Sequence, residues 1–104
     1  MEEAPKKLKL TPAAQRDLNG IWDYTAEVWS ASQAEKYLAG IEARFTAVCV
    51  SPYVARERFE FDPPIRIHRY RSHLIIYLVR QDIVSVVRVL HARQNWQVFL
   101  EGDG

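Results

Sequence analysis

Histidines and a dense set of arginines are the side chains of this sequence that could do chemistry. They gather between residues 65 and 100, where His68, His73 and His91 stand among arginines and the basic run ends at Arg93. Eight of the ten arginines lie between residues 56 and 93, against four acidic residues. Arginine makes forked contacts with phosphate and carboxylate groups, so this segregation favours a surface that recognises an acidic partner. Arginines on the solvated side of a half-buried sheet would give the same pattern.

The same side chains give little support for a metal centre, a nucleotide site or a nucleophilic enzyme. The three histidines lack the spacing of metal ligands, and none of the four glycines forms a phosphate-binding loop. The single cysteine, Cys49, falls near the apolar side of a predicted helix, where an inert buried thiol is expected. No pair of carboxylates stands out as an acid–base couple. We therefore expect no catalytic residue, no metal and no other cofactor.

Length and composition indicate one compact domain. The chain has 104 residues, 48% of them hydrophobic, and a net charge of +1, which suffices for one core but not for two. A lone cysteine excludes an internal disulfide and favours a reducing compartment. No segment has the apolar length of a signal peptide or a membrane span. A cytoplasmic protein without membrane contact is expected.

Two helices are predicted in the first half of the chain, after a short strand at residues 7–10. Thr11 followed by Pro12 is typical of a helix start, and apolar residues then recur at three- and four-residue steps. Ser30 and Ser32 begin two overlapping capping boxes, either of which could start a second helix. The short break between the helices predicts an antiparallel hairpin.

A small antiparallel sheet is predicted to follow the helices. The loop at residues 52–64 is rich in proline, and Phe59 and Phe61 are expected to hold it to the core. Three strands of a meander are predicted at residues 65–70, 74–80 and 83–90. The fold class is therefore α+β: an N-terminal strand and a helical hairpin packed on a small antiparallel β-sheet, spanning about residues 7–100.

Strand alternation predicts which side chains share a face. One face of the first meander strand carries Arg66, His68 and Tyr70, and one face of the third carries Val84, Val86, Arg88 and Leu90. If the helices cover the opposite face, the basic members of both sets converge on a shallow surface bordered by His91 and Arg93. That convergence is a hypothesis, because the register of the strands cannot be derived from the sequence.

Two motifs stand in a recognisable order. The first is Lys7-Leu8-Lys9-Leu10-Thr11-Pro12-Ala13-Ala14, before a helix with Asp17-Leu18 and Ile21-Trp22-Asp23-Tyr24; the second is Val87-Arg88-Val89-Leu90-His91-Ala92-Arg93. Over about residues 7–100 the chain resembles the ParE branch of the RelE/ParE superfamily, the toxic halves of bacterial toxin–antitoxin operons. The resemblance implies a helical hairpin on a small antiparallel sheet, neutralisation by a ParD-type antitoxin and, in the free toxin, poisoning of DNA gyrase.

The superfamily also contains ribosome-dependent messenger RNA endoribonucleases of the RelE type. Resemblance to that branch implies basic residues on the first meander strand and arginines at the start of the second strand and after the third, with a tyrosine near the carboxyl end. Arg66, His68 and Arg93 match, but Leu74 and Phe99 stand where the second-strand arginine and the tyrosine would be. Loss of one cation from such a site costs roughly 100- to 1000-fold in rate, which favours a noncatalytic gyrase inhibitor.

Two contact surfaces are predicted. Gyrase contacts are assigned to basic residues and tail aromatics: Arg66, His68, Arg88, His91, Arg93, Trp96 and Phe99. Antitoxin contacts are assigned to large aromatics of the helical hairpin, whose area exceeds what a domain of this size readily buries: Trp22, Tyr24, Trp29 and Tyr37.

Three alternatives stay open. The arginines of the first surface could pair with acidic residues and merely hold the sheet and tail together, in which case Arg88 and Arg93 would meet Glu57, Glu60 or Glu101. The chain could be a nontoxic module that only binds an antitoxin. Direct binding of nucleic acid is also left open.

Overall fold

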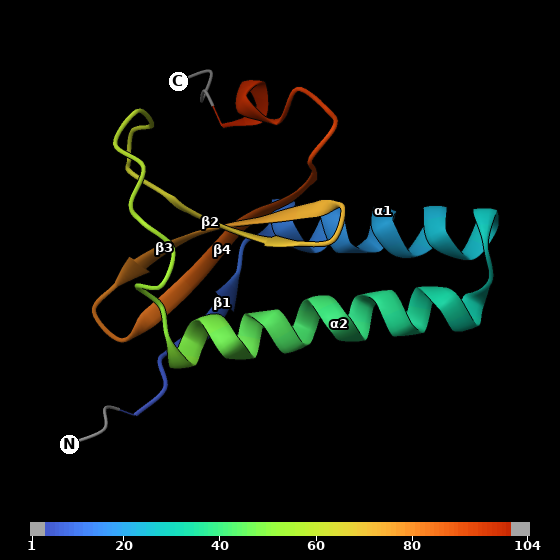
Figure 1. The fold of residues 1–104 in the computed structure, drawn as a ribbon, viewed down its shortest axis with the longest axis horizontal. Helices are drawn as coiled ribbons and strands as arrows, with labels where there is room; N and C mark the ends of the chain where they lie inside the picture. The colour runs from blue at the N-terminus through green and yellow to red at the C-terminus, as the bar shows by residue number, and fades with distance from the viewer. Residues whose placement is uncertain (1–3, 101–104) are drawn as a thin grey trace.

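The structure is a computed structural model that describes residues 4–100, with two helices packed on a four-stranded sheet (Figure 1). In chain order the elements are β1 Lys7–Leu10, α1 Pro12–Val28, α2 Ala31–Val50, β2 Arg66–Tyr70, β3 His73–Arg80, β4 Ile83–His91 and a 3₁₀ helix, η1, Trp96–Phe99. The α+β class and the antiparallel helical hairpin are confirmed. Within the described residues, neither helix combines the length and apolarity needed to cross a bilayer.

The sheet has the strand order β1-β4-β3-β2. Strands β2, β3 and β4 form the predicted antiparallel meander. Strand β1 joins β4 in parallel, which makes the sheet mixed. Parallel strands need a long connection, and here the helical hairpin and most of the meander separate β1 from β4 along the chain.

Local sequence sets the starts of both helices. The Thr11 hydroxyl oxygen accepts the amide of Ala14 at 3.0 Å, and proline occupies the first position of α1. Of the two candidate caps for α2, Ser30 is the one used, since its side chain accepts an amide of the first turn at 3.0 Å. The Thr11 hydroxyl also donates to the Val87 carbonyl at 2.8 Å, which ties the start of α1 to β4.

The sheet is covered on both faces. The helices cover one face, and the main core there includes Leu18, Ile41, Phe45, Tyr77 and Val86. The other face carries a smaller cluster, which contains Ile65, Leu74, Ile76 and Leu90 and packs against parts of the 52–64 loop and η1. In Figure 1 the loop rises from the end of α2, and its far end lies at the top together with η1, on the side of the sheet opposite α2.

The two phenylalanines of the loop have different positions. Phe61 packs into the smaller cluster, with its ring centroid 6.0 Å from that of Trp96, as predicted. The expectation for Phe59 is wrong, because its side chain is 74% exposed. Phe61 and Trp96 already cover this part of the sheet, so the loop carries Phe59 on its outer side.

A β-bulge in β4 changes which side chains share a face. Ile76 pairs with Arg88, but the next residue of β3 pairs with Val86, so Val87 is the extra residue. Val86 is buried against the helices, whereas Leu90 belongs to the cluster on the other face. The predicted single face of the third meander strand is therefore wrong beyond Val86.

The two helix-interior glycines differ in what an added methyl group would meet. A Cβ at Gly40 would overlap the phenol of Tyr70, whereas a Cβ at Gly20 meets nothing within 4 Å. Glycine inside a helix costs roughly 0.5–1 kcal/mol relative to alanine, so Gly20→Ala is expected to raise the free energy of unfolding by up to that amount. Gly40→Ala should instead lower it by about 1–3 kcal/mol through overpacking. Parallel urea titrations measure both changes, and equal stabilities would show that Tyr70 does not pack on this turn.

Candidate functional site

A groove of about 670 Å³ lies where the helical hairpin faces one end of the sheet. Its walls come from α1, the first turns of α2, the β2–β3 turn and the end of β4. It brings together three of the predicted antitoxin contacts, Tyr24, Trp29 and Tyr37, and two of the predicted gyrase contacts, Arg88 and His91. Two surfaces that the sequence predicted as separate therefore meet in one hollow.

The predicted aromatic set is divided between two hollows. Tyr24 and Trp29 are 66% and 73% exposed at the groove. Trp22 is 36% exposed and lines a second hollow with Leu8 and Leu10 of β1. Residues two positions apart on a helix do not share a face, which is why Trp22 and Tyr24 point to different sides of α1.

A histidine pair in the groove was not assigned from the sequence. His73 opens β3 and pairs with His91 at the end of β4, with ring centroids 5.1 Å apart. The Tyr37 hydroxyl lies 2.7 Å from Nδ1 of His73 and accepts the amide of Ser72 at 3.3 Å. In the tautomer of His73 that is protonated on Nε2, Nδ1 accepts a hydrogen bond from the Tyr37 hydroxyl. Counting back from the tight β3–β4 turn pairs His73 with Leu90, and only the bulge shifts the partner to His91.

His73 is expected to make stability depend on pH. Burial, followed by the neighbouring His91, lowers the pKa of His73 to about 4, and Asp17 acts in the opposite direction. His73 takes up a proton near pH 6.5 in the unfolded chain but only near pH 4 in the folded chain. The stability that the neutral, buried His73 gives the fold is therefore fully present above pH 6.5 and is lost as the pH falls toward 4. Because the ring is partly open to solvent, the loss is about 1–2 kcal/mol.

Urea titrations at neutral pH and near the lower pKa measure this effect. In His73→Asn the amide oxygen can replace Nδ1 as acceptor without titrating. The free energy of unfolding of this variant should therefore fall less on acidification than that of the parent chain. The same pH dependence in both chains would contradict the assignment.

The strongest polar contact at the groove joins α1 to β4. Arg88 donates through Nε and Nη2 to the two carboxylate oxygens of Asp17 at 2.8 and 2.9 Å, and the Val89 amide donates to the same carboxylate at 2.9 Å. The two charged side chains are 23% and 13% exposed. The hydrogen bond to Asp17 raises the pKa of Arg88, so the guanidinium stays charged. This ion pair links residues 71 positions apart in the chain.

Within the described residues, neither Arg88 nor Arg93 pairs with the glutamates suggested from the sequence. Arg88 pairs with Asp17 and not with a glutamate. Glu57 lies 3.8 Å from Arg66, and Glu60 lies 2.8 Å from Arg58. Glu101 falls outside the described residues.

The hypothesis that Arg66, His68 and Arg88 converge is also wrong. Strand β3 separates β2 from β4, and Arg88 pairs with Asp17 of α1 instead of lying beside the β2 side chains. Arg66 donates to the Ala55 carbonyl near the end of α2, while His68 lies on the helix side, 3.4 Å from Arg44. These side chains have separate surroundings because alternation along each strand does not specify how the strands pair.

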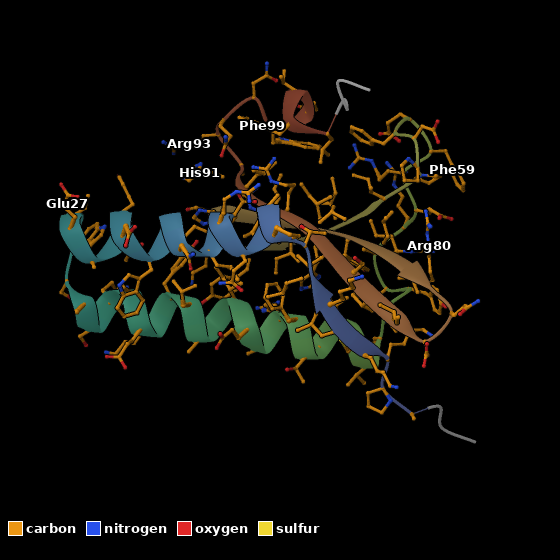
Figure 2. All side chains as sticks on the ribbon, turned by 180° about the vertical axis from the view of Figure 1, so that it is seen from behind. Glu27, Phe59, Arg80, His91, Arg93 and Phe99 are labelled. Atoms are coloured by element: carbon orange, nitrogen blue, oxygen red, sulfur yellow. The ribbon has the colours of Figure 1, made fainter. Side chains whose placement is uncertain are left out.

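The other predicted gyrase contacts lie beside the groove. The Arg93 amide donates to Nδ1 of His91 at 3.0 Å, so these two residues are neighbours. Phe99 is 49% exposed, and the Arg88 guanidinium lies 5.3 Å from the centroid of its ring. Trp96 instead packs inward on the loop. Figure 2 shows His91, Arg93 and Phe99 together on one side of the molecule, whereas Phe59 and Arg80 lie on the other.

The described residues form no recognisable metal centre or nucleophile. In residues 4–100 no three metal-binding side chains lie close enough to hold an ion. Cys49 is buried, and burial raises the pKa of its thiol, which disfavours the reactive thiolate. The walls of the groove carry aromatic rings, imidazoles and arginines.

Comparison with known proteins connects this geometry to a family. The family model for the ParE toxin of the type II toxin–antitoxin system parDE matches residues 8–96. The chain belongs to the ParE toxin family. The match includes every residue that lines the groove, and it makes the chain a toxin of the type II toxin–antitoxin class.

Individual ParE proteins agree with this assignment. Toxin ParE1 of Mycobacterium tuberculosis (strain ATCC 25618 / H37Rv) is 37% identical over 87 residues, which cover 83% of this chain and 89% of the relative. Toxin ParE of Escherichia coli is 31% identical over 87 residues, with 83% and 84% covered. A solved structure described as the chromosomal ParDE TA system from P. aeruginosa has the same fold, with a TM-score of 0.70, 19% identity, and 83% of this chain and 95% of that chain covered.

The ParE-type motifs have a structural role in this chain. Asp17, from the first motif, and Arg88, from the second, form the ion pair between α1 and β4. The second motif also supplies His91 and Arg93 at the edge of the groove. The two motifs thus hold the helical hairpin against the sheet at the place where the groove forms.

Proposed function

We propose that a ParD-type antitoxin neutralises this ParE-family toxin by seating a segment in the groove, and that the free toxin inhibits DNA gyrase by protein–protein contact. The observation that carries the proposal is the groove itself, which lies within the residues that match the ParE family model and is flanked by exposed aromatic side chains. The toxin would act without catalysis, in the cytoplasm. The solved relative described as a ParDE system supports an antitoxin partner.

The walls of the groove indicate the chemistry of the antitoxin segment. Tyr24 and Trp29 offer large exposed rings, which are the side chains that most often dominate the energy of protein interfaces. Arg16 and Arg71 line the same groove and have no acidic partner among the described residues. A complementary segment would carry apolar anchors together with carboxylates, as an amphipathic helix does.

The gyrase surface is proposed at the rim of the groove. Arg93 and Phe99 are exposed beside His91, and they form the accessible part of the predicted contacts. The other candidates have partners within the fold. Arg88 and Trp96 would support this surface from below, whereas Arg66 and His68 lie on β2, away from it. Docking here would disfavour religation of DNA that gyrase has cleaved.

The RelE-type nuclease is the weaker alternative. Leu74 is 8% exposed in the smaller cluster, so the position of the second-strand arginine is an apolar core position here. Phe99 has no hydroxyl group. A phosphoryl-transfer site without this cation and this acid would be short of charge stabilisation and of a proton donor.

The test is to add refolded, antitoxin-free chain to purified gyrase with supercoiled plasmid and ATP, and in parallel to a cell-free translation reaction. Linear plasmid that disappears when a ParD-type antitoxin is added would support the proposal. Cut messenger RNA with intact plasmid would establish the nuclease instead. If neither nucleic acid is cut while the antitoxin binds, the chain is a nontoxic binding module.

A further inference from the structure

Three arginines gather at the β2–β3 turn, close to α2, and two of them flank the ring of Tyr70. The guanidinium carbons of Arg44 and Arg71 lie 5.5 and 5.6 Å from the centroid of the Tyr70 ring. Arg69 donates through Nε to the backbone carbonyl of Arg71 at 2.7 Å, which holds the third side chain at the same turn. Arg44, Arg69 and Arg71 are all exposed, and we call them the arginine cluster.

The arginine cluster lacks compensating charge within residues 4–100. The salt bridges in that range involve Arg58, Arg66 and Arg88, and none involves a member of the cluster. Nε2 of His68 lies 3.4 Å from Nη1 of Arg44, beside the cluster. Burial, and then the positive charge of Arg44, lower the pKa of His68, so this imidazole is mostly uncharged at neutral pH and the positive charge belongs to the three arginines. Gathered like charges repel one another, and a bound anion would relieve that repulsion.

The backbone conformation at Arg71 is one that favours glycine. Its φ is 51°, in the left-handed region that glycine adopts without strain and that costs other residues about 1–2 kcal/mol. Tight hairpin turns use glycine or asparagine at such positions. Glycine at position 71 would therefore suit the turn while removing the cation.

We propose that the arginine cluster binds the phosphate backbone of duplex DNA without reading its sequence. Arginine forks match phosphate oxygens, and duplex DNA presents about one negative charge per 1.7 Å of its axis, a higher density than an acidic protein surface offers. Tyr70 is half-buried against Gly40 and lies between two guanidinium groups, so its ring is not free to stack on an unpaired base. This DNA contact rests on the proposed function, because the bound DNA would be the segment that gyrase holds.

The experiment is a fluorescence anisotropy titration of the full chain, refolded free of antitoxin, with a short labelled duplex of mixed sequence. The double variant Arg44→Gln/Arg71→Gly removes two cations, and its glycine suits the turn, so thermal melting should show an intact fold. The matched control Arg56→Gln/Arg80→Gln removes two exposed arginines elsewhere; Arg80 closes β3 at the end remote from the β2–β3 turn (Figure 2).

The cluster variant should bind the duplex about 10- to 60-fold more weakly near 0.1 M salt. The slope of log affinity against log salt should fall in magnitude by about 1.8, the value for two phosphate contacts. The control variant should lose no more than about threefold, because its charges act only through the screened long-range field. This pattern would establish the site.

Three results would overturn the inference: no binding of the parent chain to the duplex, equal losses in the two double variants, or equally effective competition by polyglutamate, which would indicate an acidic protein partner.

The plasmid assay separates this inference from the proposed function. If the cluster variant loses duplex affinity but still linearises plasmid with gyrase at the parent level, gyrase inhibition stands and the role of the DNA contact in it is refuted. If the parent chain binds duplex through the cluster but yields no linear plasmid, the proposed function fails and the DNA site stands.

Discussion

Asp17→Ala is expected to lower the free energy of unfolding by about 2–4 kcal/mol, because it leaves a half-buried guanidinium and a backbone amide without their acceptor. Asp17 receives two hydrogen bonds from Arg88 and one from the Val89 amide, and its side chain is 13% exposed. The pair also joins α1 to β4, so its loss should loosen the hairpin against the sheet. Urea titration followed by circular dichroism measures the change.

A matched control for this substitution lies on the same helix. Asp23 is exposed, and Asp23→Ala should change the free energy of unfolding by no more than about 0.5 kcal/mol. Asp17→Asn keeps an oxygen for the Val89 amide but loses the charge, so an intermediate loss is expected. Should Asp17→Ala be no more harmful than Asp23→Ala, the ion pair would be a surface contact of little energetic consequence.

Trp29→Ala is expected to weaken antitoxin binding by about 30-fold or more, which corresponds to about 2 kcal/mol at an interface hot spot. Trp29 is 73% exposed and lines the groove, so its removal takes away partner contact while leaving the core of the toxin intact. Tyr24→Ala should have a similar effect, because Tyr24 lies on the same wall and is 66% exposed. Isothermal titration calorimetry with the cognate antitoxin measures both variants.

Two other aromatic residues make this prediction specific to the groove. Phe59 is exposed to the same extent as Trp29 but lies on the far side of the molecule from His91 (Figure 2), so Phe59→Ala should change affinity by no more than about twofold. Trp22 lines the second hollow, and Trp22→Ala should cost less affinity than Trp29→Ala. If Trp22→Ala instead costs more, the antitoxin sits in the second hollow beside β1 and the groove assignment is refuted.

The boundaries of the helices and strands followed from the sequence because the forces that set them are local. Thr11 and Ser30 cap the helices within their own first turns. The aromatics Tyr24 and Trp29 were identified because the hairpin carries more aromatic surface than it can bury, and both are exposed.

The positions of the site residues relative to one another depended on register. One extra residue, Val87, makes Arg88 the partner of Ile76 and brings His91 opposite His73. Such a bulge inserts a single residue into one strand and reverses the facing of every residue beyond it, and nothing in the alternation of side chains marks where it occurs.

The sequence by itself determined the family, the α+β class and the segments that carry the aromatic and basic side chains, because periodicity, capping and motif order are properties of neighbouring residues. The tertiary structure alone decided that Asp17 meets Arg88, that Tyr37, His73 and His91 meet in one groove, and that Arg44 and Arg71 flank Tyr70. Most of these contacts join residues far apart in the chain. They form only when burial of the shared core brings α1, α2 and the sheet together.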